Sequence, residues 1–207
     1  RNDLKQNTSD LSDLLKKYHS SIGDGWEIGE NWIQKKIHEF LDQKGSKYKD
    51  ERNFPSIDGC SKLSPYLNTG VISSKWCLNE AAKRNNGELS EGDRGIVHWV
   101  SEILWREFYR HIIYNFPKVS KNKPFLDYTD KMVWSDNQAF FEAWKKGKTG
   151  IPIVDAGIRE MLSIGWMHNR TRMIVAMFLS KNLLIDWRWG EEFFMNNLID
   201  GDIASNN

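Results

Sequence analysis

The sequence of 207 residues has little of several features that would place it in a specialised class. Its two cysteines, Cys60 and Cys77, form neither a disulfide framework nor a metal-ligand spacing, which favours a reducing compartment. No apolar run approaches the roughly 18 residues of a membrane span, and the polar start RNDLKQNTSD lacks the apolar core of a signal peptide. We therefore expect a cytoplasmic protein without a membrane partner.

Net charge is also nearly absent. The chain has 29 Lys and Arg against 28 Asp and Glu, a formal charge of +1, so any contact with nucleic acid must come from a local patch. Its five histidines are scattered without the spacing of a zinc site, and we expect no metal. Tryptophan, by contrast, is abundant with ten residues, and the ordinary interpretation of each one is bulk in the core.

Strand-like alternation, internal repeats and low-complexity segments are missing too, and helical periods predict an all-α fold. Helices are expected at residues 30–45, 64–68, 73–84, 96–114, 137–146, 152–163 and 168–181, the last of them mostly apolar and buried. Loops are expected at 85–95 and 118–136, and FPSIDGC has the composition of a turn. Residues 1–28 are predicted to be a linker tail with a short helix, and residues 29–207 one helical domain.

Polar and aromatic residues interrupt the apolar runs between Gly147 and Asn207. The words GWMHNRTRM (165–173), LLIDWRWG (183–190) and LIDGDIASNN (198–207) carry Trp, Arg, Asn and Asp where an ordinary core would use Leu and Val. Each such group costs about 1 to 3 kcal/mol when it is buried without a partner. This pattern predicts that the domain holds a polar, flat ligand.

The segment SKLSPYLNTG is the candidate phosphate site. It places Ser61, Lys62 and Ser64 at the start of a predicted helix, where hydroxyls, a cation and free N–H groups together suit a phosphate. The alternative is that the two serines only cap the helix.

Two further clusters are open to two interpretations each. Trp99, Glu102 and Arg106 share a face of the helix at 96–114, either as an intrahelical ion pair over packed rings or as the floor of a ligand site. Asp200 and Asp202 flank a glycine but lack the distal Glu of a calcium loop, so a helix cap competes with a ligand contact.

These words, together with LWREFYRH, GKTGIPIVDAG and KLSPYLNTGVIS, resemble the flavin-binding domain of the photolyase and cryptochrome family over roughly residues 30–207. The resemblance is greatest to the bacterial class I cyclobutane pyrimidine dimer photolyases. It implies a monomer with reduced, anionic FAD that repairs pyrimidine dimers in damaged DNA by light-driven electron transfer. It also implies an antenna-chromophore domain before this chain and a domain that continues past Asn207.

The resemblance assigns roles to individual residues. The positions that match the FAD site are Tyr48, Ser61, Lys62, Leu63, Ser64, Trp99, Glu102, Arg106, Trp166, Asn169, Arg172, Asp200, Asp202, Ser205 and Asn206. The positions that match the catalytic machinery are Glu102, Trp105, Asn169, Met173 and Asn206. The positions that match DNA contacts are Arg52, Glu102, Trp105, Tyr109 and Arg170.

Trp134 and Trp187 match two of the three tryptophans that pass electrons to the flavin in this family, and the third would lie just past Asn207. Cys60 stands where many relatives have a hydroxyl residue, so one phosphate contact is expected to be missing. Two rival functions remain: a cryptochrome-like photoreceptor without repair activity, and an all-α binding module that has lost its flavin.

Overall fold

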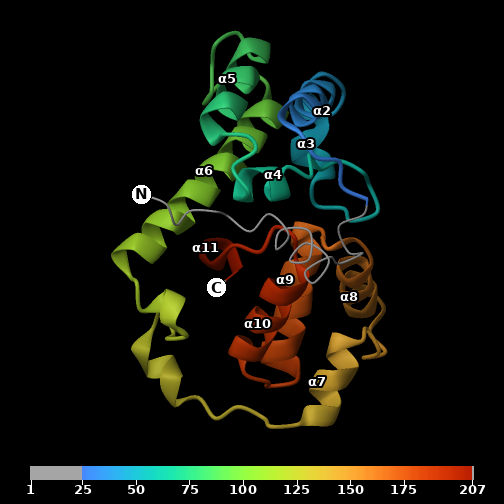
Figure 1. The fold of residues 1–207 in the computed structure, drawn as a ribbon, viewed down its shortest axis with the longest axis vertical. Helices are drawn as coiled ribbons and strands as arrows, with labels where there is room; N and C mark the ends of the chain where they lie inside the picture. Colours follow the sequence, from blue (N-terminus) through green and yellow to red (C-terminus); the bar gives the residue numbers. More distant parts are fainter. Residues whose placement is uncertain (1–24, 207) are drawn as a thin grey trace, which may run out of the picture.

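The computed structural model describes residues 25–206, and their regular structure is helical (Figure 1). Residues 1–24, with the short helix expected there, lie outside the described residues. The elements are α2 (Glu30–Gln43), η2 (Gly45–Lys47), α3 (Tyr48–Glu51), α4 (Ser64–Asn68), α5 (Ser74–Arg84), α6 (Arg94–Asn115), η3 (Val119–Lys121), η4 (Asp127–Lys131), α7 (Gln138–Lys145), α8 (Pro152–Ile164), α9 (Asn169–Met177), the π-turn η5 (Phe178–Asn182), α10 (Trp187–Asn197) and α11 (Ile203–Asn206). The all-α prediction is confirmed.

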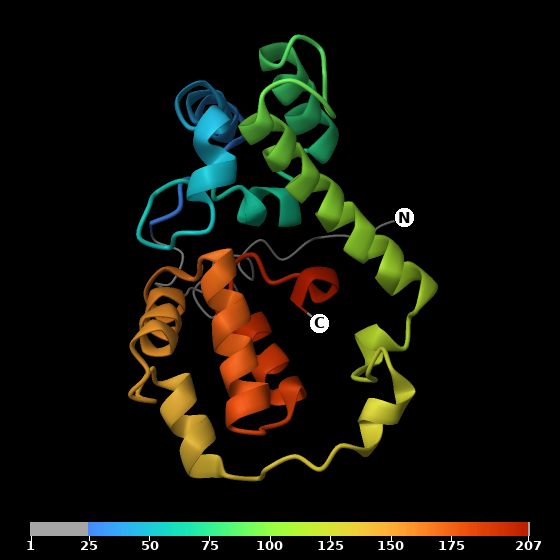
Figure 2. The same ribbon diagram turned by 180° about the vertical axis from the view of Figure 1, so that it is seen from behind.

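The helices form two lobes, each around its own apolar core. The first lobe comprises α2 to α5 and the first half of α6, and residues such as Ile37, Cys77 and Ile103 fill its core. The second lobe comprises α7 to α10, with Trp144 fully buried at its centre. Figure 2 shows α11 in the space between the lobes, where it packs against α6. Helix α11 therefore contacts both lobes, through α6 and through α10.

The long helix α6 leads from the first lobe to the segment that precedes α7. Asp93 caps its first turn by accepting from the amides of Gly95 and Ile96. A Cβ at Gly95 would lie 2.2 Å from the carbonyl oxygen of Gly45, so only glycine allows this close approach to η2. Beyond α6 the chain runs in an arc around the second lobe before it enters α7 (Figure 1). This arc contains only the short turns η3 and η4, as expected for residues 118–136.

The structure differs from the expected helices in four details. Residues 48–51, for which no helix was expected, form the short helix α3, and residues 187–197, for which none was expected either, form α10. The helix expected at 168–181 ends at Met177 and continues as the π-turn η5. It is also not mostly buried, because Met173 and Met177 are 48% and 49% exposed.

None of the helices within residues 25–206 combines the length and the apolar character that crossing a membrane requires.

Candidate cofactor site between the two lobes

Two serine hydroxyls face the lobe boundary. The Oγ of Ser61 accepts a hydrogen bond from the Trp99 indole N–H at 3.2 Å, and the Oγ of Ser64 accepts from that of Trp166 at 3.4 Å. Neither serine caps α4, whose N-cap is Leu63 without a side-chain bond, so the capping alternative is wrong. Since a hydroxyl that accepts still has its own proton to donate, both serines remain able to bind an acceptor oxygen.

The residue between these serines has an unusual backbone. Lys62 has a φ of 50°, in the left-handed region that costs a non-glycine residue roughly 1 to 2 kcal/mol. Its ammonium lies 5.4 Å from the centre of the Trp166 ring and 3.4 Å from a carboxylate oxygen of Asp58. Strained residues of this kind are concentrated at ligand sites. Lys62 thus adds a cation to the segment that carries the two free hydroxyls.

Across the boundary, Arg172 and Asp200 form an ion pair. Arg172 Nη2 donates to Asp200 Oδ2 at 2.8 Å, and Arg172 Nε donates to the Met167 carbonyl at 2.8 Å. The Asp200 side chain is 1% exposed. Its second oxygen, Oδ1, is buried and has no hydrogen-bond partner among residues 25–206. A buried carboxylate oxygen without a donor is costly, so it is an acceptor available to a ligand.

The segment after Asp200 returns to α6. Asp202 caps the short helix α11, with Oδ1 accepting from the Ala204 amide at 3.2 Å and Oδ2 from the Ser205 hydroxyl at 3.3 Å. The capping interpretation is thus confirmed for Asp202, whereas Asp200 pairs with another helix. Asn206 donates through Nδ2 to the Glu191 carbonyl at 3.3 Å.

Glu102 takes a partner from outside its own helix. Arg52 Nη1 donates to Glu102 Oε1 and lies 2.6 Å from His98 Nε2, while its guanidinium sits 5.5 Å from the centre of the Tyr48 ring. Arg106 instead donates to the Leu67 carbonyl and to Glu107, so the expected Glu102–Arg106 pair is wrong. Burial raises the pKa of Tyr48 and keeps its phenol neutral. Arg52, which was predicted to contact DNA, is only 8% exposed, and its guanidinium binds Glu102 inside the protein.

His98 is expected to make the stability of the folded chain depend on pH. Burial and the neighbouring Arg52 lower its pKa, so the neutral ring accepts the proton that Arg52 donates. As pH falls, the unfolded chain takes up the proton first, and the stability contributed by neutral His98 is lost below about pH 6.5. We expect His98→Gln to flatten the fall in unfolding free energy between pH 7 and pH 5, measured by urea titration. An identical slope in both proteins would contradict this account.

On the outer face of α6, three aromatic rings form an exposed cluster. Trp105, Phe108 and Tyr109 are 50%, 48% and 43% exposed, and the Trp105 ring lies 5.3 Å from Phe108 and 6.0 Å from Tyr109. Phe108 is not among the residues predicted from the sequence. The signal was present in the word REFYRH, because exposed rings that lie side by side are unusual on a soluble surface.

The start of α9 is organised by His168, which the sequence analysis also missed. Its Nδ1 accepts from the Arg170 amide at 3.2 Å, so its proton is on Nε2 and points at the Cys60 sulfur 3.5 Å away. Burial lowers the pKa of His168. Arg170 Nε donates to Asn53 Oδ1 at 2.9 Å, and its Nη1 contacts the Met173 sulfur at 3.4 Å. The cap thus orients a cation at the exposed rim of the lobe boundary.

The two predicted electron-transfer residues, Trp134 and Trp187, lie on segments that a backbone bridge joins. A parallel bridge joins Ser135 to Ile185, with the Ser135 amide donating to the Leu184 carbonyl at 2.7 Å. It brings the segments of Trp134 and Trp187 together, and both side chains are half-buried. No group of His, Cys, Asp and Glu in the described part of the chain has the arrangement of a metal site.

The all-helical fold and the polar cluster between two lobes define a domain of the photolyase and cryptochrome fold. A class III photolyase from Agrobacterium tumefaciens superposes with a TM-score of 0.81 and 37% identity over 97% of this chain and 39% of that one. A Synechocystis cryptochrome superposes with a TM-score of 0.80 and 34% identity over 87% of this chain and 38% of that one. The family model described as the FAD binding domain of DNA photolyase matches residues 99–207. Because this match covers more than half of the sequence, the chain belongs to that family.

Curated relatives carry the name deoxyribodipyrimidine photo-lyase. The Neurospora crassa protein is 46% identical over 94% of this chain and 31% of its own length. The Escherichia coli protein is 48% identical over 83% of this chain and 36% of its own length. The chain thus spans about a third of the length of the curated relatives it matches.

Proposed function

We propose that this chain is the flavin-binding part of a deoxyribodipyrimidine photolyase, which repairs cyclobutane pyrimidine dimers in DNA with light. The observation that carries the proposal is the boundary between the lobes. Near it, Ser61 and Ser64 keep hydroxyl protons free to donate, and a buried carboxylate oxygen of Asp200 has no donor among the described residues. The family membership and the names of the relatives support FAD as the group held there.

The residues fit FAD by their chemistry. Ser61, Ser64 and Lys62 offer two hydroxyl donors and a cation, which suit the pyrophosphate. Asp200 Oδ1 offers an acceptor for a ring or ribose hydrogen, and Arg172 holds that carboxylate in place. Arg106 and Asn206 supply donors, and Asn206 would stabilise negative charge on the ring through its amide dipole. When bound, reduced, anionic FAD would supply the light-excited electron that splits the dimer.

The chain's own part in repair is to bind and orient the lesion. Trp105 presents an exposed ring on which an extruded dimer can stack, and Tyr109 extends the same surface. Glu102 is 30% exposed and is held by Arg52, so one carboxylate edge can accept a hydrogen bond from the dimer. Asn169 and Met173 lie exposed at the start of α9 and complete the rim. Because Arg52 is engaged internally, we assign it to positioning Glu102.

DNA affinity is assigned to Arg170, which lies at the rim with its guanidinium on Asn53 and Met173. An Arg170→Ala variant should bind DNA several-fold more weakly, and the slope of log K against log salt should fall by about 1, since one phosphate contact is lost. Binding is measured by fluorescence anisotropy between 50 and 200 mM salt. An unchanged slope would exclude Arg170 as a phosphate contact.

The test of the proposed function is an absorption spectrum after incubation with FAD, followed by illumination with a dimer-containing oligothymidylate. Flavin bands together with restored thymine absorbance are expected. Flavin without repair would instead support the photoreceptor alternative that the cryptochrome neighbour represents. Failure to bind FAD would overturn the cofactor assignment.

A further inference from the structure

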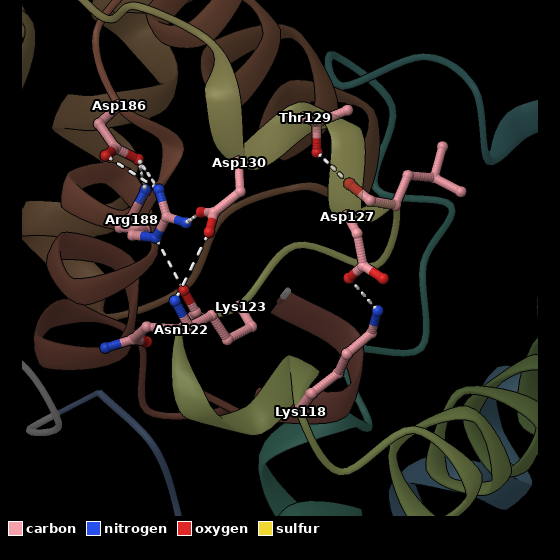
Figure 3. A network of polar contacts seen from close by, with 9 residues as sticks. Lys118, Asn122, Lys123, Asp127, Thr129, Asp130, Asp186 and Arg188 are labelled. Atoms are coloured by element: carbon pink, nitrogen blue, oxygen red, sulfur yellow. Dashed lines mark hydrogen bonds and ion pairs between the residues drawn. The ribbon is translucent and has the colours of Figure 1, made fainter.

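Arg188 is the centre of a polar network outside the cofactor site (Figure 3). It lies in the first turn of α10, directly after Trp187. Its Nη1 donates to both Asp186 oxygens at 3.3 and 3.1 Å, its Nη2 to Asp130 Oδ1 at 2.8 Å and its Nε to the Asn122 carbonyl at 2.8 Å. All three of its nitrogens are thus engaged, and the side chain is only 25% exposed.

The partners of Arg188 come from two distant parts of the chain. Asp186 is the N-cap of α10 and accepts from the Arg188 amide as well as from its guanidinium. Asp130 and Asn122 belong to the arc between α6 and α7, more than 50 residues earlier in the sequence. Within the described residues this arc contains no α-helix, and its regular structure is limited to η3 and η4. The position of the arc relative to α10 therefore depends on individual side-chain and backbone contacts. The contacts of Arg188 join the arc to the first turn of α10.

In the sequence, these contacts lie on both sides of each of the two tryptophans that the family resemblance assigns to electron transfer. On the arc, Trp134 lies between Asp130, which binds Arg188, and Ser135, which binds the Leu184 carbonyl at 2.7 Å. On the other segment, Trp187 lies between Leu184, which binds Ser135, and Arg188, which binds Asp130. The guanidinium carbon of Arg188 also lies 4.9 Å from the centre of the Trp187 ring. One side chain thus fixes the Trp187 ring and fastens the segment that carries Trp134.

We propose that Arg188 is the positioning residue of this tryptophan pair, holding Trp134 within electron-transfer reach of Trp187. The electron-transfer role of the pair rests on the proposed function, whereas the contacts by which Arg188 holds the arc on α10 do not. In the step that Arg188 serves, light-excited FAD would first draw an electron from Trp187 through the third tryptophan, and one electron would then pass from Trp134 to Trp187, which returns to its neutral state. Trp134 is then oxidised and releases its indole proton to solvent, and a thiol in solution restores both the electron and the proton.

The charge balance around the ring supports a positioning role over a purely electrostatic one. A lone guanidinium over Trp187 would oppose the positive charge that the oxidised ring carries. Asp186 and Asp130 each contribute a carboxylate within 3.1 Å of Arg188, so the cation has two anionic partners of its own. These partners offset its positive charge near the ring, and the contribution that we assign to Arg188 is geometric.

The first test needs no cofactor. Hydrogen exchange of the Ser135 amide, followed by mass spectrometry on peptides covering residues 132–136, reports whether the arc stays on α10. We expect roughly tenfold faster exchange in Arg188→Ala, with Arg188→Lys in between because it keeps the charge but loses the planar fork. Lys123→Ala is the matched control, since it removes the other cation near Asp130, at 3.5 Å, and leaves Arg188 in place. Equal exchange in Arg188→Ala and the unaltered chain would overturn the proposal.

The second test measures light-driven reduction of bound FAD in the presence of a thiol, in a chain that extends past Asn207 to include the third tryptophan. Trp134→Phe and Arg188→Ala are each expected to slow it by about tenfold or more, and the double variant to be no slower than Trp134→Phe alone. Independent, multiplying effects would show that Arg188 acts elsewhere and would overturn the positioning role. Bound FAD that is not reduced in this extended chain would refute the relay that the family resemblance implies, and the Ser135 exchange would still decide whether Arg188 fastens the arc.

Discussion

An Arg172→Ala variant is expected to lose about 3 kcal/mol of unfolding free energy. The reason is the carboxylate that it leaves behind, because the Asp200 side chain is 1% exposed and Arg172 is its only hydrogen-bond donor in the part of the chain that the structure describes. Breaking a buried pair from one side leaves an uncompensated charge. We place the loss at the lower end of the usual range, since Arg172 is 23% exposed. The melting temperature should fall by roughly 6 to 12 °C.

The control for this prediction removes the charge instead of the partner. Asp200→Asn keeps the shape and an oxygen that can accept from Arg172, and it leaves only a partly exposed cation unpaired. We expect a stability loss of about 1 kcal/mol, well below that of Arg172→Ala. Thermal unfolding measured with and without added FAD separates the structural role from the binding role. Equal losses in the two variants would contradict a buried, charged Asp200.

Both variants should also weaken the stabilisation by FAD. A ligand that binds only the folded chain raises its stability by about 2.7 kcal/mol at a hundredfold excess over Kd. Asp200→Asn replaces the acceptor pair by one oxygen and one amide donor, so the shift on adding FAD should shrink. An unchanged shift would mean that Asp200 Oδ1 does not contact the cofactor.

The boundaries of most helices followed from local signals, whereas α10 did not. Pro152, Gly147 and Gly165 mark helix ends that the sequence already indicates, because proline and left-handed glycine act within one or two residues. The segment WRWGEEFFMNN carries a glycine at its centre, which normally weakens a helix. Gly190 is tolerated because a Cβ there would lie 2.6 Å from a Leu179 methyl group, so glycine allows α10 to pack closely on η5. That contact is invisible in the sequence.

Side-chain partners were the part that spacing could not predict. Glu102 and Arg106 are four residues apart, which favours a local pair, yet Glu102 binds Arg52, fifty residues earlier. The serines of SKLSPYLNTG could equally have capped α4, and only the positions of Trp99 and Trp166 turn them toward the lobe boundary. A motif therefore identifies which residues belong to a site, while long-range packing decides which atoms remain free for a ligand.

Burial was also overestimated from apolar composition. Met173, Ile174 and Met177 make α9 appear to be a core helix, but they are 48%, 39% and 49% exposed. An apolar side chain can remain at the surface, since folded proteins do not have enough polar surface to cover themselves. In α9 the buried positions are Thr171 and Val175, which lie one turn apart and face α8 across Gly157, where a Cβ would lie 2.3 Å from a Thr171 methyl group.

Trp105→Ala is the functional variant with the largest expected effect. Its ring is half exposed and packs on Phe108 and Tyr109 of the same helix, so its removal should change the melting temperature little. Stacking of a base on an aromatic ring contributes about 1 to 3 kcal/mol, which corresponds to roughly 5- to 150-fold in affinity. We expect that loss for DNA that contains a dimer, measured by anisotropy, while FAD binding and affinity for undamaged DNA stay close to those of the unaltered chain.

Two comparisons make this expectation specific to stacking. Phe108→Ala removes a ring of similar exposure 5.3 Å away and should affect damaged and undamaged DNA alike, because the proposal gives it no contact with the lesion. The salt slope should also separate the two kinds of contact. Arg170→Ala should lower it, whereas Trp105→Ala should leave it unchanged, since stacking on a neutral ring releases no counterions. Equal losses of affinity for damaged and undamaged DNA in Trp105→Ala would rule out lesion stacking and reduce the exposed rings on α6 to a general DNA-binding surface.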